Sequence, residues 1–216
     1  MLQPIDEPPQ RLSRAEFHAW TAAQPRGRFE RIDGVVVAMA PEGVVHNRLK
    51  AAAWLLLRQG IQANQLPREA LTDGLGLEIG EDDDFEPDAI VRCGERLEDN
   101  ATKVPDPLIV VEILSPSTSA THRTTKLEKH FRLPSVQHYL IVWADRRRVV
   151  HHRRDGQGLT TTVHSEGTIL SLTLALPALP RAARRAVPHP PALAHLPPPL
   201  GRGRPVPRAV CRGHRQ

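Results

Sequence analysis

The sequence predicts a mixed α/β fold, restriction-endonuclease-like in outline, with a central mixed sheet flanked by helices. Three observations indicate a sheet with helices. They are a hairpin signal near the N-terminus, an apolar run at 108–114 that is typical of an interior strand, and helix signals at 46–62 and 121–133. The chain has 216 residues, of which 40% are hydrophobic and 25% charged, so it can bury a core of its own. Strands and helices that alternate along a chain usually pack as layers.

The N-terminal elements are expected to be a short helix and a β-hairpin. Ser13 and Glu16 have the spacing of a capping box, which favours a helix that starts here. Asp33-Gly34 lies between two segments rich in strand-forming residues, 29–32 and 35–39. This dipeptide is typical of a two-residue hairpin turn.

A helix and several strands are expected to follow. Apolar residues recur at helical spacing along 46–62, which predicts an amphipathic helix. Short strands are expected at 66–72, 75–79, 85–91 and 108–114. The acidic run at 81–84 is predicted to be a solvated loop.

The last elements are a helix and a strand pair. A helix is expected at 121–133, because Pro134 would end it. Strands are expected at 139–143, 149–152 and 159–164. We therefore expect a flexible N-terminus at 1–10, one domain at 11–172 and a separate tail at 173–216.

The tail differs sharply in composition from the domain. It holds ten of the 21 prolines and eight arginines without a single acidic residue, which predicts disorder. Residues 1–172 hold 21 basic and 24 acidic residues, a net charge of −3, although the whole chain carries +5. The global charge is therefore no argument for nucleic-acid binding by the domain. Three interpretations of the tail stay open: a non-specific hold on nucleic acid, a terminus without a task, or a GC-rich gene read out of frame.

Several protein classes are excluded by what the sequence lacks. It has no run of the ~20 apolar residues that a membrane helix needs, and no basic and then apolar leader. We expect a cytoplasmic protein without a membrane partner. Two cysteines cannot build a disulfide framework or a cysteine-based zinc site. The phosphate-binding Walker loop, the dinucleotide glycine pattern and the HExxH motif are absent from the sequence.

Two carboxylates and a lysine are the candidate site. Glu112 interrupts an apolar strand, where a charge is costly unless it meets a cation; a structural salt bridge and a functional site both fit. Asp88 precedes an apolar run, where a turn cap is the structural interpretation. On neighbouring strands the two would suit Mg²⁺ or Mn²⁺, which complete their shells with water and phosphate oxygens. Lys126, one helix further on, could hold a phosphate or a water.

The order of these residues resembles a known group. Pro87-Asp88, then Glu112 on an apolar strand, then a lysine resemble the PD-(D/E)xK restriction-endonuclease-like superfamily. Within it, the chain is similar over about residues 11–172 to the Uma family (Uma two) of restriction endonucleases. The matching segments are Phe29–Gly34, Met39-Ala40-Pro41 with His46, Val111–Thr118, Lys126-Leu127 and Val136–Val142.

The resemblance implies a role for each site residue. Asp88 and Glu112 would bind the metal, Glu30 would be a further acid beside it, and Lys126 would come from a helix because Leu114 takes the superfamily's lysine position. His122 and His130 stand where relatives have Asp and Tyr. They share a helix face with Lys126. Three interpretations of the two histidines stay open: a solvated helix face, altered surroundings of the lysine, or sequence drift after loss of activity. His46 is a substrate-binding candidate or an exposed histidine at a helix end.

Two functions remain in competition. The first is a metal-dependent endonuclease that hydrolyses phosphodiester bonds of nucleic acid, with DNA as the expected partner and a homodimer as a possible assembly. The second is a catalytically degenerate member that serves as a nucleic-acid-binding or protein-interaction module.

Overall fold

The computed structural model describes residues 11–94, 96–114, 120–143, 145–156, 158–168, 170 and 172; the side chains of 120–124 are not described. The expected flexible N-terminus at 1–10 and the tail at 173–216 lie outside these residues and remain predictions. Among the described residues, no helix is long and apolar enough to cross a membrane. Two β-sheets and three helices build the described part of the chain.

The larger sheet has six strands and is mixed, as expected. Its strand order is β10 (Gly158–His164), β9 (Arg148–Asp155), β8 (His138–Trp143), β7 (Pro107–Leu114), β6 (Ala89–Cys93) and β3 (Arg68–Thr72). β7 and β8 are parallel, and the other neighbours are antiparallel. The apolar run that predicted an interior strand is β7, which lies between β8 and β6.

The smaller, antiparallel sheet was not foreseen as a separate layer. Its strand order is β2 (Val35–Ala38), β1 (Phe29–Ile32), β5 (Asp83–Phe85) and β4 (Leu77–Ile79). The expected hairpin is confirmed, because β1 pairs with β2 across Asp33 and Gly34. Both turn residues have positive φ, 52° and 78°, as this kind of two-residue turn requires.

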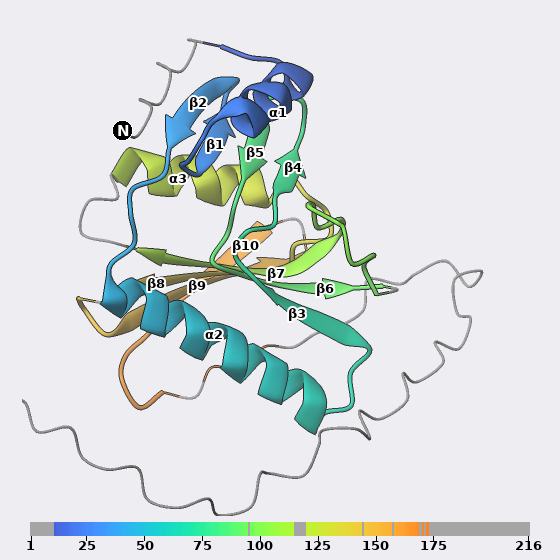
Figure 1. Ribbon diagram of the computed structural model, residues 1–216. Coiled ribbons are helices and arrows are strands. Elements are labelled where there is room, and N and C mark those ends of the chain that lie inside the picture. The colour runs from blue at the N-terminus through green and yellow to red at the C-terminus, as the bar shows by residue number, and fades with distance from the viewer. Residues whose placement is uncertain are drawn as a thin grey trace, which may run out of the picture. The chain divides into compact units, whose positions relative to one another are not determined.

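Two of the helices lie on opposite sides of the six-stranded sheet (Figure 1). α1 (Arg14–Ala23) starts with the expected capping box and packs beside the smaller sheet. α2 (Val44–Ala63) runs along one face of the six-stranded sheet, and α3 (Ala120–His130) lies on the other side, with the smaller sheet. The face of β6 and β7 that is turned toward α3 therefore lies between two layers of the fold.

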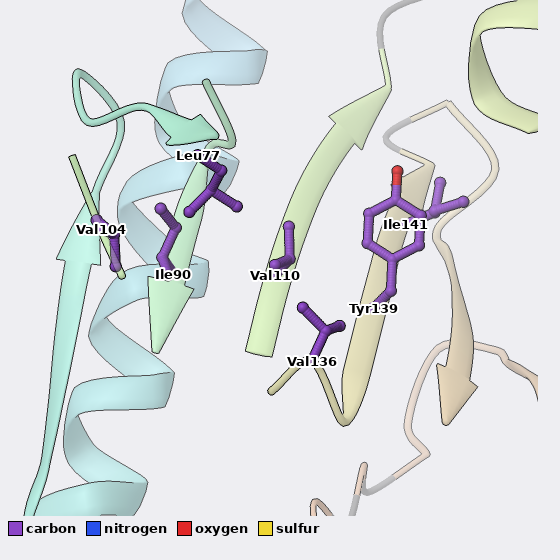
Figure 2. Close-up of a cluster of buried hydrophobic side chains, with 7 residues drawn as sticks. All are labelled: Leu77, Ile90, Val104, Val110, Val136, Tyr139 and Ile141. Carbon is purple, nitrogen blue, oxygen red and sulfur yellow. The ribbon is translucent and has the colours of Figure 1, made fainter. Parts of the chain in front are cut away.

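The core explains which way Glu112 points. Along β7, Ile109 and Val111 pack in the cluster beneath α2, whereas Val110 belongs to the cluster on the opposite face, which Figure 2 shows. Because strand side chains alternate between faces, Glu112 shares the face of Val110. Tyr139 of β8 lies in the same cluster.

The prediction of a single strand at 85–91 is wrong. The chain instead ends β5 at Phe85 in the smaller sheet and begins β6 at Ala89 in the larger one. Pro87 has no N–H to donate to a strand ladder, so the chain changes sheets around it. This crossover places Asp88 at the start of β6.

The prediction of a solvated loop at 81–84 is also wrong for residues 83 and 84. Asp83 and Asp84 are buried in β5. Asp84 Oδ2 accepts a 2.7 Å hydrogen bond from Nε of the fully buried Arg31. Asp83 Oδ1 accepts a 2.5 Å bond from Nζ of Lys129 on α3. The cations that permit this burial are 46 and 53 residues away, so the local acidic run could not reveal them.

Candidate active site

Asp88 and Glu112 face each other across two neighbouring strands. β6 and β7 pair Ala89 with Val111 and Ile90 with Val110. One further step of this register places Asp88 opposite Glu112, on the face that carries Val110. The Ile113 N–H donates to Asp88 Oδ2 at 2.7 Å, so the carboxylate is held from the neighbouring strand and is not a local turn cap.

Lys126 reaches this pair from α3. Its Nζ lies 2.8 Å from Glu30 Oε1 and 3.2 and 3.3 Å from the two oxygens of Glu112. Glu30 comes from β1, and its Oε1 also accepts the Glu86 N–H at 3.0 Å. The predicted meeting of Glu30, Glu112 and Lys126 is therefore present, with the lysine supplied by the helix.

Burial and charge perturb the site's pKa values in different directions. Burial raises the pKa of Asp88, and the neighbouring Glu112 charge adds to this, to about 6. Burial also opposes the charge of Glu112, but Lys126 and His130 hold its pKa below the usual range. Burial alone would lower the pKa of Lys126, yet the two glutamates raise it. Lys126 therefore stays protonated, and Asp88 is the carboxylate of the pair whose charged form is disfavoured.

These residues line a pocket of about 360 Å³ that is rich in negative charge. Five carboxylates and one lysine line it: Glu30, Glu42, Glu86, Asp88, Glu112 and Lys126. Carboxylate oxygens are the ligands that Mg²⁺ and Mn²⁺ prefer. A bound cation would also relieve the repulsion between Asp88 and Glu112, so the donor set fits a divalent ion.

His46 belongs to the pocket wall and is not an exposed helix end. Its Nε2 lies 2.9 Å from the Ile113 carbonyl oxygen and 3.6 Å from Asp88 Oδ2. Glu42, which the sequence did not single out, has Oε2 3.5 Å from the Nδ1 of His46. Glu42 is already neutralised by an ion pair with Lys50 and a 2.6 Å hydrogen bond from Arg28. No recognisable motif marks Glu42 or Glu86 in the sequence.

His130 is fully buried, so the solvated face is wrong for this residue. Its ring packs between Phe85 and Tyr139, with centroid distances of 5.2 and 4.9 Å. Its Nε2 lies 3.5 Å from Glu112 Oε1. His130 therefore forms part of the surroundings of Glu112 and Lys126. The side chain of His122 lies outside the described residues, so its expected place beside Lys126 stays a prediction.

The chain is similar to a protein family, to a curated protein and to a solved structure. Residues 14–184 match the model of the Uma2 family, whose description is “Putative restriction endonuclease”. The chain is 27% identical over 147 residues to the “Uncharacterized protein slr1290” of Synechocystis sp., covering 67% of this chain and 76% of that protein. A crystal structure of “a putative nuclease belonging to DUF820” from Anabaena variabilis superposes with a TM-score of 0.59 at 22% identity. The superposition covers 75% of this chain and 89% of the other.

These similarities cover the part of the chain that carries the pocket. The solved structure shares the fold. The family match spans every element from α1 to β10, including the four residues that converge in the pocket. The chain belongs to the Uma2 family, the “Putative restriction endonuclease” family.

Proposed function

We propose that the protein is a divalent-metal-dependent endonuclease that hydrolyses phosphodiester bonds of DNA. The observation that carries this proposal is the pocket in which Asp88 faces Glu112 while Lys126 contacts Glu112 and Glu30. Membership of the Uma2 family supports a nuclease. The solved structure from Anabaena is likewise described as a nuclease.

Asp88 and Glu112 would hold Mg²⁺ or Mn²⁺, and Glu30 would lie beside the ion. When bound, such an ion activates water and neutralises the charge that develops on a phosphodiester. The protein's own contribution is to hold the carboxylates. Ile113 N–H fixes Asp88 at 2.7 Å, and Glu86 N–H fixes Glu30 at 3.0 Å.

Lys126 acts as a positive charge and a hydrogen-bond donor. Because its pKa is raised by Glu112 and Glu30, it keeps its proton at neutral pH and cannot serve as the base. Its ammonium group can donate to a phosphate oxygen or to the attacking water. The pocket is otherwise negative, so a phosphate approaches favourably only when cations face it.

A specific contact favours the second candidate, a non-catalytic nucleic-acid-binding module. Lys126 already bridges Glu30 and Glu112, so its ammonium group neutralises two carboxylates without any metal ion. A degenerate site would keep this ion pair and bind no manganese. The expected homodimer and the cytoplasmic location also remain predictions.

Removal of metal tests the proposal. Purified protein is expected to cut supercoiled plasmid DNA in Mg²⁺ or Mn²⁺ and to lose all cleavage in EDTA, because the carboxylate pair needs the ion. Gel electrophoresis of plasmid, with an RNA transcript in parallel, measures this and the choice of nucleic acid. Cleavage that persists in EDTA would contradict metal dependence. No cleavage with either ion, together with no saturable Mn²⁺ binding by calorimetry, would support the non-catalytic module.

A further inference from the structure

A short basic segment lies at the end of the six-stranded sheet where Leu114, a residue that lines the pocket, ends β7. Arg146, Arg147 and Arg148 are consecutive and exposed. The first two lie between β8 and β9, and Arg148 is the first residue of β9. β7 and β8 are parallel, and Leu114 of β7 is paired with Trp143 of β8. The carboxyl ends of both strands therefore lie at one edge. Leu114 itself lines the pocket, so the arginines and the pocket share this edge.

Two of the three arginines lie on the pocket's side of the sheet. Tyr139 lines the pocket, and Trp143 follows it by four residues on β8, so the two share a face. The Arg146 guanidinium stacks on Trp143, 4.3 Å from the ring centroid. Arg148 is the β9 residue paired with Trp143 and therefore lies on the same face.

The neighbouring charges leave Arg146 and Arg148 available to a ligand. Arg147 is engaged elsewhere, with Nη1 3.0 Å from Glu166 Oε1. Among the described residues, the ion pair of Arg146 is a long one, with Nε 3.9 Å from Oδ2 of the exposed Asp145. Stacking on Trp143 preorients the guanidinium, which lowers the entropy lost when it binds.

We propose that Arg146, stacked on Trp143, and Arg148 bind the phosphate backbone of the nucleic acid whose cleavage the pocket performs. This inference rests on the proposed function. Glu112 and Leu114 are two residues apart on β7, about 7 Å along the strand, so Trp143, which pairs with Leu114, lies close to the reacting centre. The carboxylates of the pocket outnumber its single lysine, and the two guanidinium groups at this end of the sheet supply an attraction for a polyanion.

The double variant Arg146→Ala/Arg148→Ala tests this inference. Binding to a short fluorescein-labelled DNA duplex is measured by anisotropy in Ca²⁺ over a series of salt concentrations. Loss of two phosphate contacts is expected to weaken binding roughly tenfold or more and to reduce the slope of log K against log salt by about 1.8. Arg146→Lys keeps the charge but loses the planar stack, so its affinity should fall less and its slope should stay unchanged.

Arg96→Ala is the matched control. Arg96 is also an exposed arginine, with a side chain 79% exposed, but it lies in the connection that leads to the opposite end of β7. Its removal should leave both the affinity and the salt slope unchanged. The inference is overturned if the double variant behaves like Arg96→Ala while the wild type binds and cuts DNA. A wild type that neither binds nor cuts DNA would instead overturn the proposed function itself.

Discussion

Replacement of Asp88 by Asn is expected to slow DNA cleavage strongly and, at the same time, to stabilise the metal-free protein. Asn has the same shape and can still accept the Ile113 N–H, but it is a poor ligand for Mg²⁺ or Mn²⁺. Without the ion, the transition state of cleavage loses several kcal/mol of stabilisation, which corresponds to at least about a 10²-fold slower reaction. Plasmid cleavage in Mg²⁺ measures the first effect, and Glu112→Gln should show the same loss.

The gain in stability follows from the pKa of Asp88. Its folded-state pKa of about 6 lies above the ordinary 3.8. The folded protein therefore binds this proton more tightly than the unfolded chain, and stability falls as the pH rises from 4 through 6. At neutral pH the ionised carboxylate costs on the order of 3 kcal/mol, which Asn removes. Urea unfolding in EDTA at pH 7 measures the difference.

An exposed carboxylate provides the control for both measurements. The side chain of Asp99 is 90% exposed and pairs with Arg96. Asp99→Asn should change neither cleavage nor the free energy of unfolding. If the Asp88→Asn variant cleaves DNA as fast as the wild type, Asp88 is not a metal ligand. A lower free energy of unfolding in EDTA would show that the charge of Asp88 is satisfied in the folded protein.

Replacement of Lys126 by Ala is expected to slow cleavage by roughly 10²- to 10³-fold, the usual cost of losing one donor to developing charge. It also leaves Glu30 and Glu112 buried without their cation, which should destabilise the metal-free protein by about 3–5 kcal/mol. Mn²⁺ can replace the missing charge. The rise in melting temperature on adding Mn²⁺ should therefore be larger for this variant than for the wild type, as differential scanning fluorimetry can show.

Lys129 is a control on the same helix. It is also buried and ion-paired, but with Asp33 and Asp83, and it does not line the pocket. Lys129→Ala should therefore lose a similar amount of stability and, below its melting temperature, retain cleavage. Equal cleavage by the two variants would mean that Lys126 has only a structural role.

Much of the fold could be predicted from local sequence patterns, because the residues that form each pattern lie close together in the chain. The capping box at Ser13 and the Asp33-Gly34 hairpin are of this kind, and both are present. The apolar run around Glu112 likewise identified β7, because an interior strand is apolar on both faces. The separate smaller sheet was missed because strand partners such as β1 and β5 are about 50 residues apart.

The site was predictable only in part, for the same physical reason. Glu112 stood out because a lone charge in an apolar strand needs a partner. Lys126 was a candidate because it lies one helix further on, and Glu30 followed from the family resemblance. The buried pairs of Asp84 with Arg31 and of Asp83 with Lys129 involve partners from other elements, so their run of acids resembled a solvated loop. The burial of His130 beside Glu112 likewise depends on packing against Phe85 and Tyr139.

The most direct measurement is anomalous diffraction from crystals of the wild-type protein soaked in Mn²⁺. A metal-dependent nuclease predicts an anomalous peak between β6 and β7, with oxygens of Asp88 and Glu112 about 2 Å from the ion. Crystals that contain manganese elsewhere, or none, while Lys126 still bridges Glu30 and Glu112, would contradict a metal site at this carboxylate pair.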